Sequence, residues 1–540
     1  MSRSKQLIVV ENERSDDFLI NQEQRDFGTN INSSNFSVLM AIKDNACTCA
    51  KKNALIEGLS GHSVSYGEFW RNIIDFATII HSQGLIKNEC VIILVNQSIA
   101  YMEMFYGIQL AGGIAVPIEP GTSNDVLKKY ASFFSSRFIV VKGIIYDSHF
   151  ANMLVEHKCH AQLIFSFNDE EATKQNIEYY NKFFMPTPND PALILMTSGT
   201  NGENKAVVGS HKGRYCGADN VSDAYGLNVD DTALIPQPLS HSGGLRRVEA
   251  MFICGGTAVI MKPTMFFGDV FAALKNYNCN VLQLVPAQAE QILRSAKKLL
   301  SASRDQLKIV AVGSAEITEV CKEALRELLP GVRLFNDYGS TEAIGSAYFE
   351  WSAYPPKPYC VGREGRHSNI TFLNECGLPY SASSDKPGII ATEGDTLMLG
   401  YYGETEINAS SLVDGRVVST DLGYRGDDGM IYIVGRKSDI IISGANKITP
   451  VEIEEVVGRI NGVKECAVIA KPDHIMGHLP ALFVVFDKHV PITINDIICE
   501  MCNKLEHYKV PKAENIFSIS SLPRTPGTGK VIKRHLLEEV

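Results

Sequence analysis

Short apolar runs and stretches of helical periodicity alternate along the chain up to about residue 312. The run from Cys90 to Val95 is apolar throughout, as expected of a strand buried on both faces of a parallel sheet. Ahead of it, apolar residues from Ile73 to Ile80 recur with helical spacing, and Ser65 is placed to cap that helix. Repeated alternation of this kind predicts α/β layers. Further apolar runs lie at Gly113 to Ile118, Phe138 to Val141, Gln162 to Phe165, Ala192 to Met196, Thr257 to Met261 and Ile309 to Val312.

The pattern changes at about Gly388, where short alternating strands are separated by glycine and aspartate turns. Such a texture is typical of a β-rich subdomain. The last hundred residues combine an amphipathic helix at Val451 to Val457 with strand-like and helical segments, which predicts a smaller α+β unit. The predicted fold is therefore α/β, with layered α/β subdomains and a β-rich subdomain followed by a small mobile α+β domain. The expected boundaries are a loosely ordered lead-in over 1–36, an N-terminal domain over 37–436 and a C-terminal domain over 437–540.

Composition narrows the classes of protein. A chain of 540 residues that is 45% hydrophobic can bury a large core in more than one domain. The chain has a net charge of -10 and no long basic run, so it lacks the electrostatic footprint of a nucleic-acid-binding protein. Neither a signal peptide nor a membrane span is expected, because Glu11 and Glu13 end the first apolar run. The thirteen cysteines are scattered and odd in number, which predicts a reducing cytoplasm and no zinc site.

Two distant segments carry candidate chemistry. Met196 to Lys205 reads MTSGTNGENK, a loop of hydroxyl groups and glycines that follows an apolar strand. Pro523 to Lys530 reads PRTPGTGK, a turn that presents one lysine. Unobstructed backbone N–H groups and hydroxyls can surround polyphosphate oxygens, and a lysine supplies a compact positive charge. The pair predicts nucleotide chemistry assembled from two parts of one chain.

Together these segments resemble the adenylate-forming family of acyl-CoA synthetases, luciferases and peptide-synthetase adenylation domains. The loop is similar to the family's TSGTTGxPKG signature, with Asn201, Asn204 and Ala206 as departures. Further family segments follow in order, and the resemblance extends from about Tyr66 to Leu536. It implies an enzyme that uses ATP and Mg²⁺ to convert a carboxylic acid to an acyl-adenylate, and then transfers the acyl group.

The resemblance also implies roles for individual residues. Lys530 would act in catalysis by bridging the carboxylate and α-phosphate oxygens, and Glu342 would bind Mg²⁺. Asp421 would accept the ribose hydroxyl protons, and either Asp337 or Asn336 would pair with the adenine amino group. The nucleotide site would comprise Thr197, Ser198, Gly199, Thr200, Gly202, Lys205, Gly313, Ser314, Ala315, Asn336, Asp337, Tyr338, Gly339, Thr341, Asp421 and Arg436.

The acyl pocket and the acceptor are less well defined by the sequence. His241 falls at a catalytic or gating position of the family. The segment from Pro238 to Leu245 contains no acidic residue that could pair with the ammonium group of an amino-acid substrate. An aromatic, alicyclic or medium-chain acid is therefore favoured over an amino acid. CoA is the leading acceptor, and an amine or a separate carrier protein are the alternative acceptors. A relative that binds nucleotide or acyl ligand without catalysis is the alternative to an enzyme. The remaining assignments are the acyl pocket (His241, Gly243, Gly244, Gly345, Ser346, with Gly313, Ser314 and Ala315 at its border), the hinge (Ser438) and the acceptor channel (Gly444, Ala445, Lys447).

Overall fold

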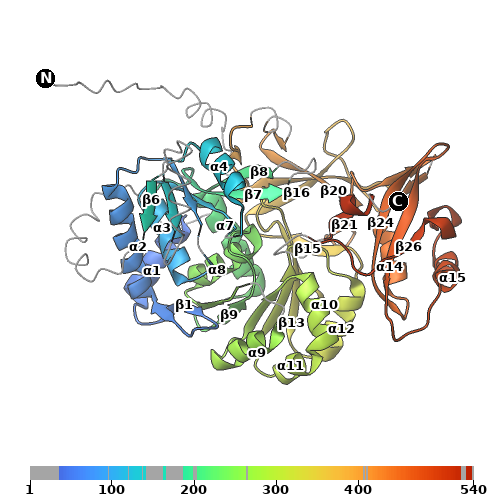
Figure 1. Cartoon of the computed structure of the whole chain (residues 1–540), viewed down its shortest axis with the longest axis horizontal. Helices are drawn as coiled ribbons and strands as arrows, with labels where there is room; N and C mark the ends of the chain where they lie inside the picture. Colours follow the sequence, from blue (N-terminus) through green and yellow to red (C-terminus); the bar gives the residue numbers. More distant parts are fainter. Residues whose placement is uncertain are drawn as a thin grey trace.

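Two sheets carry the apolar runs of the N-terminal part (Figure 1). The computed structural model describes residues 36–94, 96–119, 121–136, 138–141, 162–165, 186–198, 204–262, 266–404, 408, 411–444, 446–524 and 531–537. The first sheet contains β3 (Cys90–Ile93), β4 (Ile114–Pro117), β5 (Phe138–Val141), β6 (Gln162–Phe165), β7 (Pro191–Ser198), β8 (Asn204–Ser210) and β18 (Gly400–Tyr401). Its order is β18-β8-β7-β4-β3-β5-β6.

The second sheet joins the α/β part to the β-rich part. Its strands are β1 (Asn53–Glu57), β2 (Ser63–Ser65), β9 (Thr232–Ile235), β10 (Thr257–Ile260), β11 (Val281–Leu284), β12 (Ile309–Gly313), β13 (Arg333–Tyr338), β14 (Ala347–Glu350), β15 (Cys360–Glu364), β16 (Ser368–Leu373), β17 (Gly388–Gly394), β19 (Leu412–Val413), β20 (Arg416–Arg425) and β21 (Ile431–Arg436). They follow the order β16-β17-β20-β21-β15-β14-β13-β12-β11-β9-β10-β1-β2, and β19 pairs with β20. The strands from β13 through β9 to β1 are parallel, whereas those from β14 to β16 are antiparallel.

Helices cover both faces of these sheets, which explains the continuous apolar runs. In β9, Ala233 and Ile235 pack into a core shared with the helices between the sheets, whereas Leu234 faces the opposite core. The helices between the sheets are α1 (Val38–Thr48), α2 (Tyr66–Ser82), α3 (Ile99–Leu110), α7 (His211–Tyr225) and α8 (Ser242–Cys254). The outer helices are α4 (Asn124–Phe133) on the first sheet, and α9 (Phe267–Asn276), α10 (Pro286–Ser295), α11 (Lys297–Ala302) and α12 (Glu319–Leu328) on the second.

The predicted cap of α2 is present. The Ser65 hydroxyl accepts from the Glu68 N–H at 3.3 Å, and the Glu68 carboxylate accepts from the Ser65 N–H at 2.9 Å. This reciprocal capping box satisfies two backbone donors that a helix start otherwise leaves unpaired. The local sequence therefore fixes where the helix begins.

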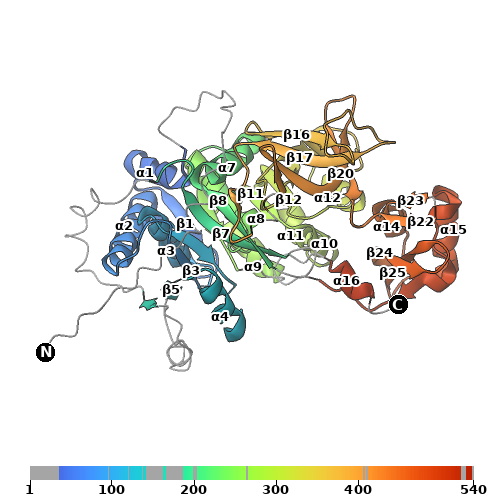
Figure 2. The same cartoon turned by 90° about the horizontal axis from the view of Figure 1, so that it is seen from above.

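The C-terminal unit has a sheet of its own at the end of the molecule opposite α1 and α2 (Figure 2). Arg294 of α10 links it to the large part, through Nη2 to the Lys464 carbonyl at 2.7 Å and Nη1 to Glu465 at 3.3 Å. The α/β fold class with a small C-terminal domain is confirmed, while the exact domain boundaries stay a prediction. Its elements are β22 (Ile441–Ser443), β23 (Asn446–Ile448), α14 (Pro450–Gly458), β24 (Val463–Asp473), β25 (Gly477–Phe486), α15 (Ile494–Lys504), β26 (Ile516–Ser518) and α16 (Lys533–Leu536). Across the ranges that the structure describes, none of the helices is long and apolar enough to cross a membrane.

Candidate active site

Strands β7 and β8 form an antiparallel hairpin at the predicted phosphate loop. Thr197 lies opposite Lys205, and Ser198 lies opposite Asn204, so the loop 199–203 joins the two strand ends. The predicted residues Gly199, Thr200 and Gly202 lie outside the described residues. The hairpin nevertheless places Lys205 beside the position of the loop, as a phosphate-binding lysine requires.

Tyr401 brings the candidate phosphate lysine and the candidate Mg²⁺ ligand together. The Lys205 ammonium lies 4.9 Å from the centre of the Tyr401 ring, within the range of a cation–π interaction. The hydroxyl of the same tyrosine donates to Glu342 Oε1 at 2.9 Å. Burial, followed by the adjacent Glu342 carboxylate, raises the pKa of Tyr401. Tyr401 therefore remains a protonated donor that orients Glu342.

The backbone of residues 395–402, which we term the bridging segment, explains why these groups meet. On one side, Thr396 O accepts from Ile344 N at 3.1 Å and Met398 N donates to Glu342 O at 2.8 Å. On the other side, Leu399 N and Tyr402 N donate to the carbonyls of β8, each at 2.8 Å. The bridging segment thus connects the loop that carries Glu342 to the strand that carries Lys205.

A second group of residues meets where β13, β20 and β21 lie together. The Tyr338 hydroxyl donates to Asp421 Oδ2 at 2.8 Å, and Arg436 Nε lies 3.2 Å from Asp421 Oδ1. Asp421 and Arg436 are directly opposite in the β20–β21 pair. Gly339 follows Tyr338, and a Cβ there would lie only 2.8 Å from Gly345 N, so the chain turns too tightly for a side chain. Three side chains of the predicted nucleotide site, Tyr338, Asp421 and Arg436, are therefore adjacent.

The two candidates for adenine pairing have different surroundings. Both oxygens of the Asp337 carboxylate are held by buried arginines, Oδ2 by Arg246 and Oδ1 by Arg247 at 2.9 Å. Asn336 Oδ1 is buried and has no hydrogen-bond partner among the residues described. An unpaired acceptor suits the amino group of adenine. Of the two alternatives, the geometry therefore favours Asn336 as the partner of the adenine amino group, because the Asp337 carboxylate is held in an ion pair with Arg246 and Arg247.

Arg247 connects this ion pair to the predicted acyl pocket. Its Nη1 donates to Gly243 O at 3.0 Å and lies 3.5 Å from Ser314 Oγ. A Cβ at Gly313 would lie 1.9 Å from Asp337 Oδ1, so this glycine is required for the close approach. Because two buried arginines share one carboxylate, this end of the pocket carries surplus positive charge.

His241 immediately precedes α8 and pairs with Glu119, a residue that the sequence did not suggest. Its Nε2 lies 3.3 Å from Glu119 Oε1, which also accepts from Ser240 Oγ at 2.5 Å. The hydrogen bond from His241 is the main cause that lowers the pKa of Glu119. The pair joins the start of α8 to the segment after β4.

Several predicted pocket residues have evident structural roles. A Cβ at Gly244 would lie 2.3 Å from Pro238 O, and Gly345 has a left-handed φ of +60°. Ser346 is buried, and its hydroxyl donates to Ala343 O at 3.0 Å. Gly244 therefore allows the first turn of α8 to approach Pro238 closely, whereas Gly345 and Ser346 shape the loop between β13 and β14.

The hinge and acceptor residues are only partly described. Ser438 is exposed between β21 and β22, and its hydroxyl donates to Asp439 at 2.9 Å. Gly444 has a φ of +60°, and its N–H donates to Met476 O at 2.8 Å. The structure does not describe Ala445, Lys530 or the side chains of Ser198 and Lys447. It describes Thr341 and Ala315, which are both half-buried.

Sequence reasoning missed Tyr401, Arg246, Arg247 and Glu119. A signal existed for the arginines, because the buried helix α8 places Arg246, Arg247 and Glu249 among apolar residues. Charges on such a helix indicate internal ion pairs or a ligand. Tyr401 carries no comparable signal, since its role depends on the bridging segment.

The chain belongs to the AMP-binding enzyme family: residues 42–402 match that family, and residues 452–530 match its C-terminal domain. The indoleacetate–CoA ligase of Aromatoleum aromaticum is 30% identical over 348 residues, which cover 64% of this chain and 66% of the relative. The 2-succinylbenzoate–CoA ligase of Listeria monocytogenes is 26% identical over 90% of this chain and 96% of its own. ATP-bound MatB of Rhodopseudomonas palustris shares the fold, with a TM-score of 0.81 and 22% identity over 92% and 98% of the two chains. The predicted family and enzyme class are confirmed.

The shared ion pair yields a stability prediction. Asp337→Asn leaves Arg246 and Arg247 buried without a counter-charge, so we expect the free energy of unfolding to fall by about 3–5 kcal/mol. Asp305→Asn is the control, because Asp305 is exposed and, within the described part of the chain, pairs only with its neighbour Arg304; its loss should cost less than about 1 kcal/mol. Urea unfolding of the large domain measures both. Equal, small losses would contradict the buried ion pair.

Proposed function

We propose that this chain is an acid–CoA ligase that forms an acyl-adenylate from ATP and then transfers the acyl group to CoA. Two groups of contacts carry the proposal: Lys205, Tyr401 and Glu342 meet, and Tyr338, Asp421 and Arg436 meet. Glu342 lies in the loop that follows Tyr338, which connects the two groups. One group suits phosphates and a metal ion, and the other suits a nucleoside. The named CoA ligases among the relatives support CoA as the acceptor.

In the first step, a carboxylate oxygen attacks the α-phosphate of ATP, and pyrophosphate leaves. Lys205 would neutralise phosphate charge, and the Asp421 carboxylate would accept hydrogen bonds from the ribose hydroxyls. Glu342 offers a hard carboxylate oxygen of the kind that Mg²⁺ prefers, and Mg²⁺ bound there would help to neutralise the phosphates. Tyr401 fixes that carboxylate by its hydrogen bond. Lys530 would stabilise the charge that develops between the carboxylate and the α-phosphate.

In the second step, a thiol attacks the acyl carbonyl, and AMP leaves. We propose that the C-terminal domain turns about Ser438 between the steps, which would bring Gly444, Ala445 and Lys447 to the acceptor channel. Exposure of Ser438 between the sheets of the two units supports such a pivot. An amine and a separate carrier protein remain the competing acceptors. A cytoplasmic location, expected from the scattered cysteines, also stays a prediction.

The central test is a screen for pyrophosphate release with ATP, Mg²⁺ and a panel of acids. The panel contains aromatic, alicyclic and medium-chain acids, and also dicarboxylic acids because of the surplus charge beside Arg247. For an accepted acid, Lys530→Ala should slow adenylation by about 10²-fold or more, since the lost contact acts in the transition state. Lys512→Ala is a matched control, because Lys512 is an exposed lysine of the same domain.

Products are then identified by mass spectrometry with CoA, with mixed amino acids, and with both. Acyl-CoA should form only when CoA is present. Enzyme-dependent amide without acyl-CoA would replace the proposal by an amide synthetase. Wild-type adenylation by the Lys530 variant would remove the role assigned to that lysine.

The hinge is tested by Ser438→Pro. Proline fixes φ and restricts the preceding residue, so rotation should be obstructed and acyl transfer should slow more than adenylation. Transfer is measured in a single turnover from preformed acyl-adenylate, and adenylation by pyrophosphate release. Ser438→Ala is the control and should leave both rates nearly unchanged. Equal slowing of the two steps by proline would place the pivot elsewhere.

A further inference from the structure

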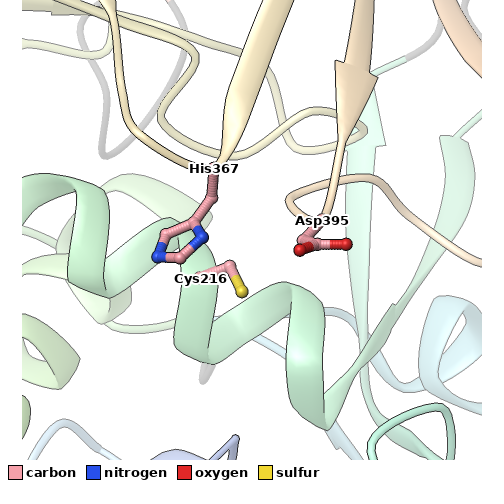
Figure 3. Close-up of side chains that lie close together, drawn as sticks. All are labelled: Cys216, His367 and Asp395. Carbon is pink, nitrogen blue, oxygen red and sulfur yellow. The ribbon is translucent and has the colours of Figure 1, made fainter. Parts of the chain in front are cut away.

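Three side chains with metal-binding atoms meet, and none of them belongs to the predicted nucleotide site. Cys216 comes from α7, His367 precedes β16, and Asp395 follows β17 (Figure 3). One ligand atom from each lies within 4.8 Å of the other two. Cys216 is fully buried, and the side chains of His367 and Asp395 are 4% and 16% exposed.

The hydrogen bonds of His367 leave one ring nitrogen for a ligand. Its Nε2 lies 2.7 Å from Asp219 Oδ2, and Asp219 also accepts from Arg366 Nε at 2.8 Å. The other ring nitrogen, Nδ1, is buried and has no hydrogen-bond partner in the described part of the chain. A histidine that binds a metal ion typically makes such a bond to a carboxylate with its second nitrogen. Asn220 Oδ1 further fixes the loop by accepting from His367 N at 3.0 Å.

We propose that Cys216 Sγ, His367 Nδ1 and an oxygen of Asp395 bind one Zn²⁺ ion. A donor set of sulfur, imidazole nitrogen and carboxylate oxygen matches the preferences of zinc. Tetrahedral zinc separates its donor atoms by about 3.3–3.7 Å, so the three groups need to approach by only about an ångström. Lys212 Nζ lies 2.9 Å from Asp395 Oδ1, which leaves the second oxygen for the ion. Water would complete the coordination.

This ion would act as a structural clamp on the active site. Asp395 begins the bridging segment, and its N–H donates to His367 O at 3.0 Å. The neighbouring residues of that segment hold the loop that carries Glu342. On α7, a Cβ at Gly217 would lie 2.6 Å from Ile344 Cγ2, so the helix packs directly against the same loop. Zinc would therefore join α7 to the bridging segment, which holds the loop that carries Glu342.

The direct experiment uses Co²⁺ as a spectroscopic substitute for Zn²⁺. The full-length protein is freed of metal with a chelator and titrated with Co²⁺. One equivalent should produce visible d–d bands and a near-ultraviolet thiolate-to-cobalt band, which one equivalent of Zn²⁺ should remove and excess Mg²⁺ should not. Zn²⁺ should also raise the melting temperature. Absence of stoichiometric binding would overturn the proposal.

Variants assign the ligands. Cys216→Ser should abolish the thiolate band, Asp395→Asn should weaken binding, and Asp219→Asn should weaken it by about 10–100-fold through the histidine. The controls are Cys321→Ser, a buried cysteine elsewhere, and the double change Cys499→Ser with Cys502→Ser, which removes an exposed cysteine pair; both should retain the spectrum. An undiminished thiolate band in Cys216→Ser, or its loss in the double variant, would contradict the site. If Cys216→Ser does not fold, unchanged affinity in the near-isosteric Asp395→Asn would also contradict it.

Discussion

The bridging segment, residues 395–402, is the constraint on which the active site depends. Its backbone pairs with the Glu342 loop on one side and with β8 on the other. Neither connection is local in sequence, yet together they place the Tyr401 ring beside Lys205 and its hydroxyl on Glu342. Backbone hydrogen bonds of this kind fix positions more rigidly than exposed side-chain ion pairs do. The groups proposed to bind phosphate and Mg²⁺ are therefore already held together in the chain without a nucleotide.

A second constraint is the buried charge at the base of the predicted acyl pocket. Asp337 holds Arg246 and Arg247, and Arg247 reaches Gly243 and Ser314. Burying two guanidinium groups has a large desolvation free energy. The ion pair with Asp337 offsets that free energy only if its geometry is good. The same network connects β13, which carries the candidate adenine contacts, to α8, which borders the predicted acyl pocket. We therefore expect a change in the shape of the predicted acyl pocket to affect the proposed adenine site as well.

The sequence predicted those features that depend on local pattern. The apolar runs became strands because helices cover both faces of the sheets, and Ser65 caps α2 through its reciprocal bonds with Glu68. Tyr338, Asp421 and Arg436 came from the family resemblance, and the structure brings them together.

The rest depends on contacts between distant segments. Tyr401 meets Glu342 only through the bridging segment. The sequence left Asp337 and Asn336 as alternatives for adenine, because the motif does not reveal that buried arginines occupy the Asp337 carboxylate. The scattered cysteines predicted no zinc site, and the zinc site proposed above joins Cys216 to His367 and Asp395, which lie far from it in the sequence. Burial and pairing of polar groups decide these cases, and neither can be inferred from spacing alone.

A crystal structure of the protein with ATP and Mg²⁺ tests the central claim most directly. We expect phosphates beside Lys205, Mg²⁺ on Glu342, adenine against Tyr338 with its amino group at Asn336 Oδ1, and the ribose hydroxyls on Asp421. Nucleotide bound elsewhere, or bound here with Mg²⁺ held by residues other than Glu342, would contradict the account.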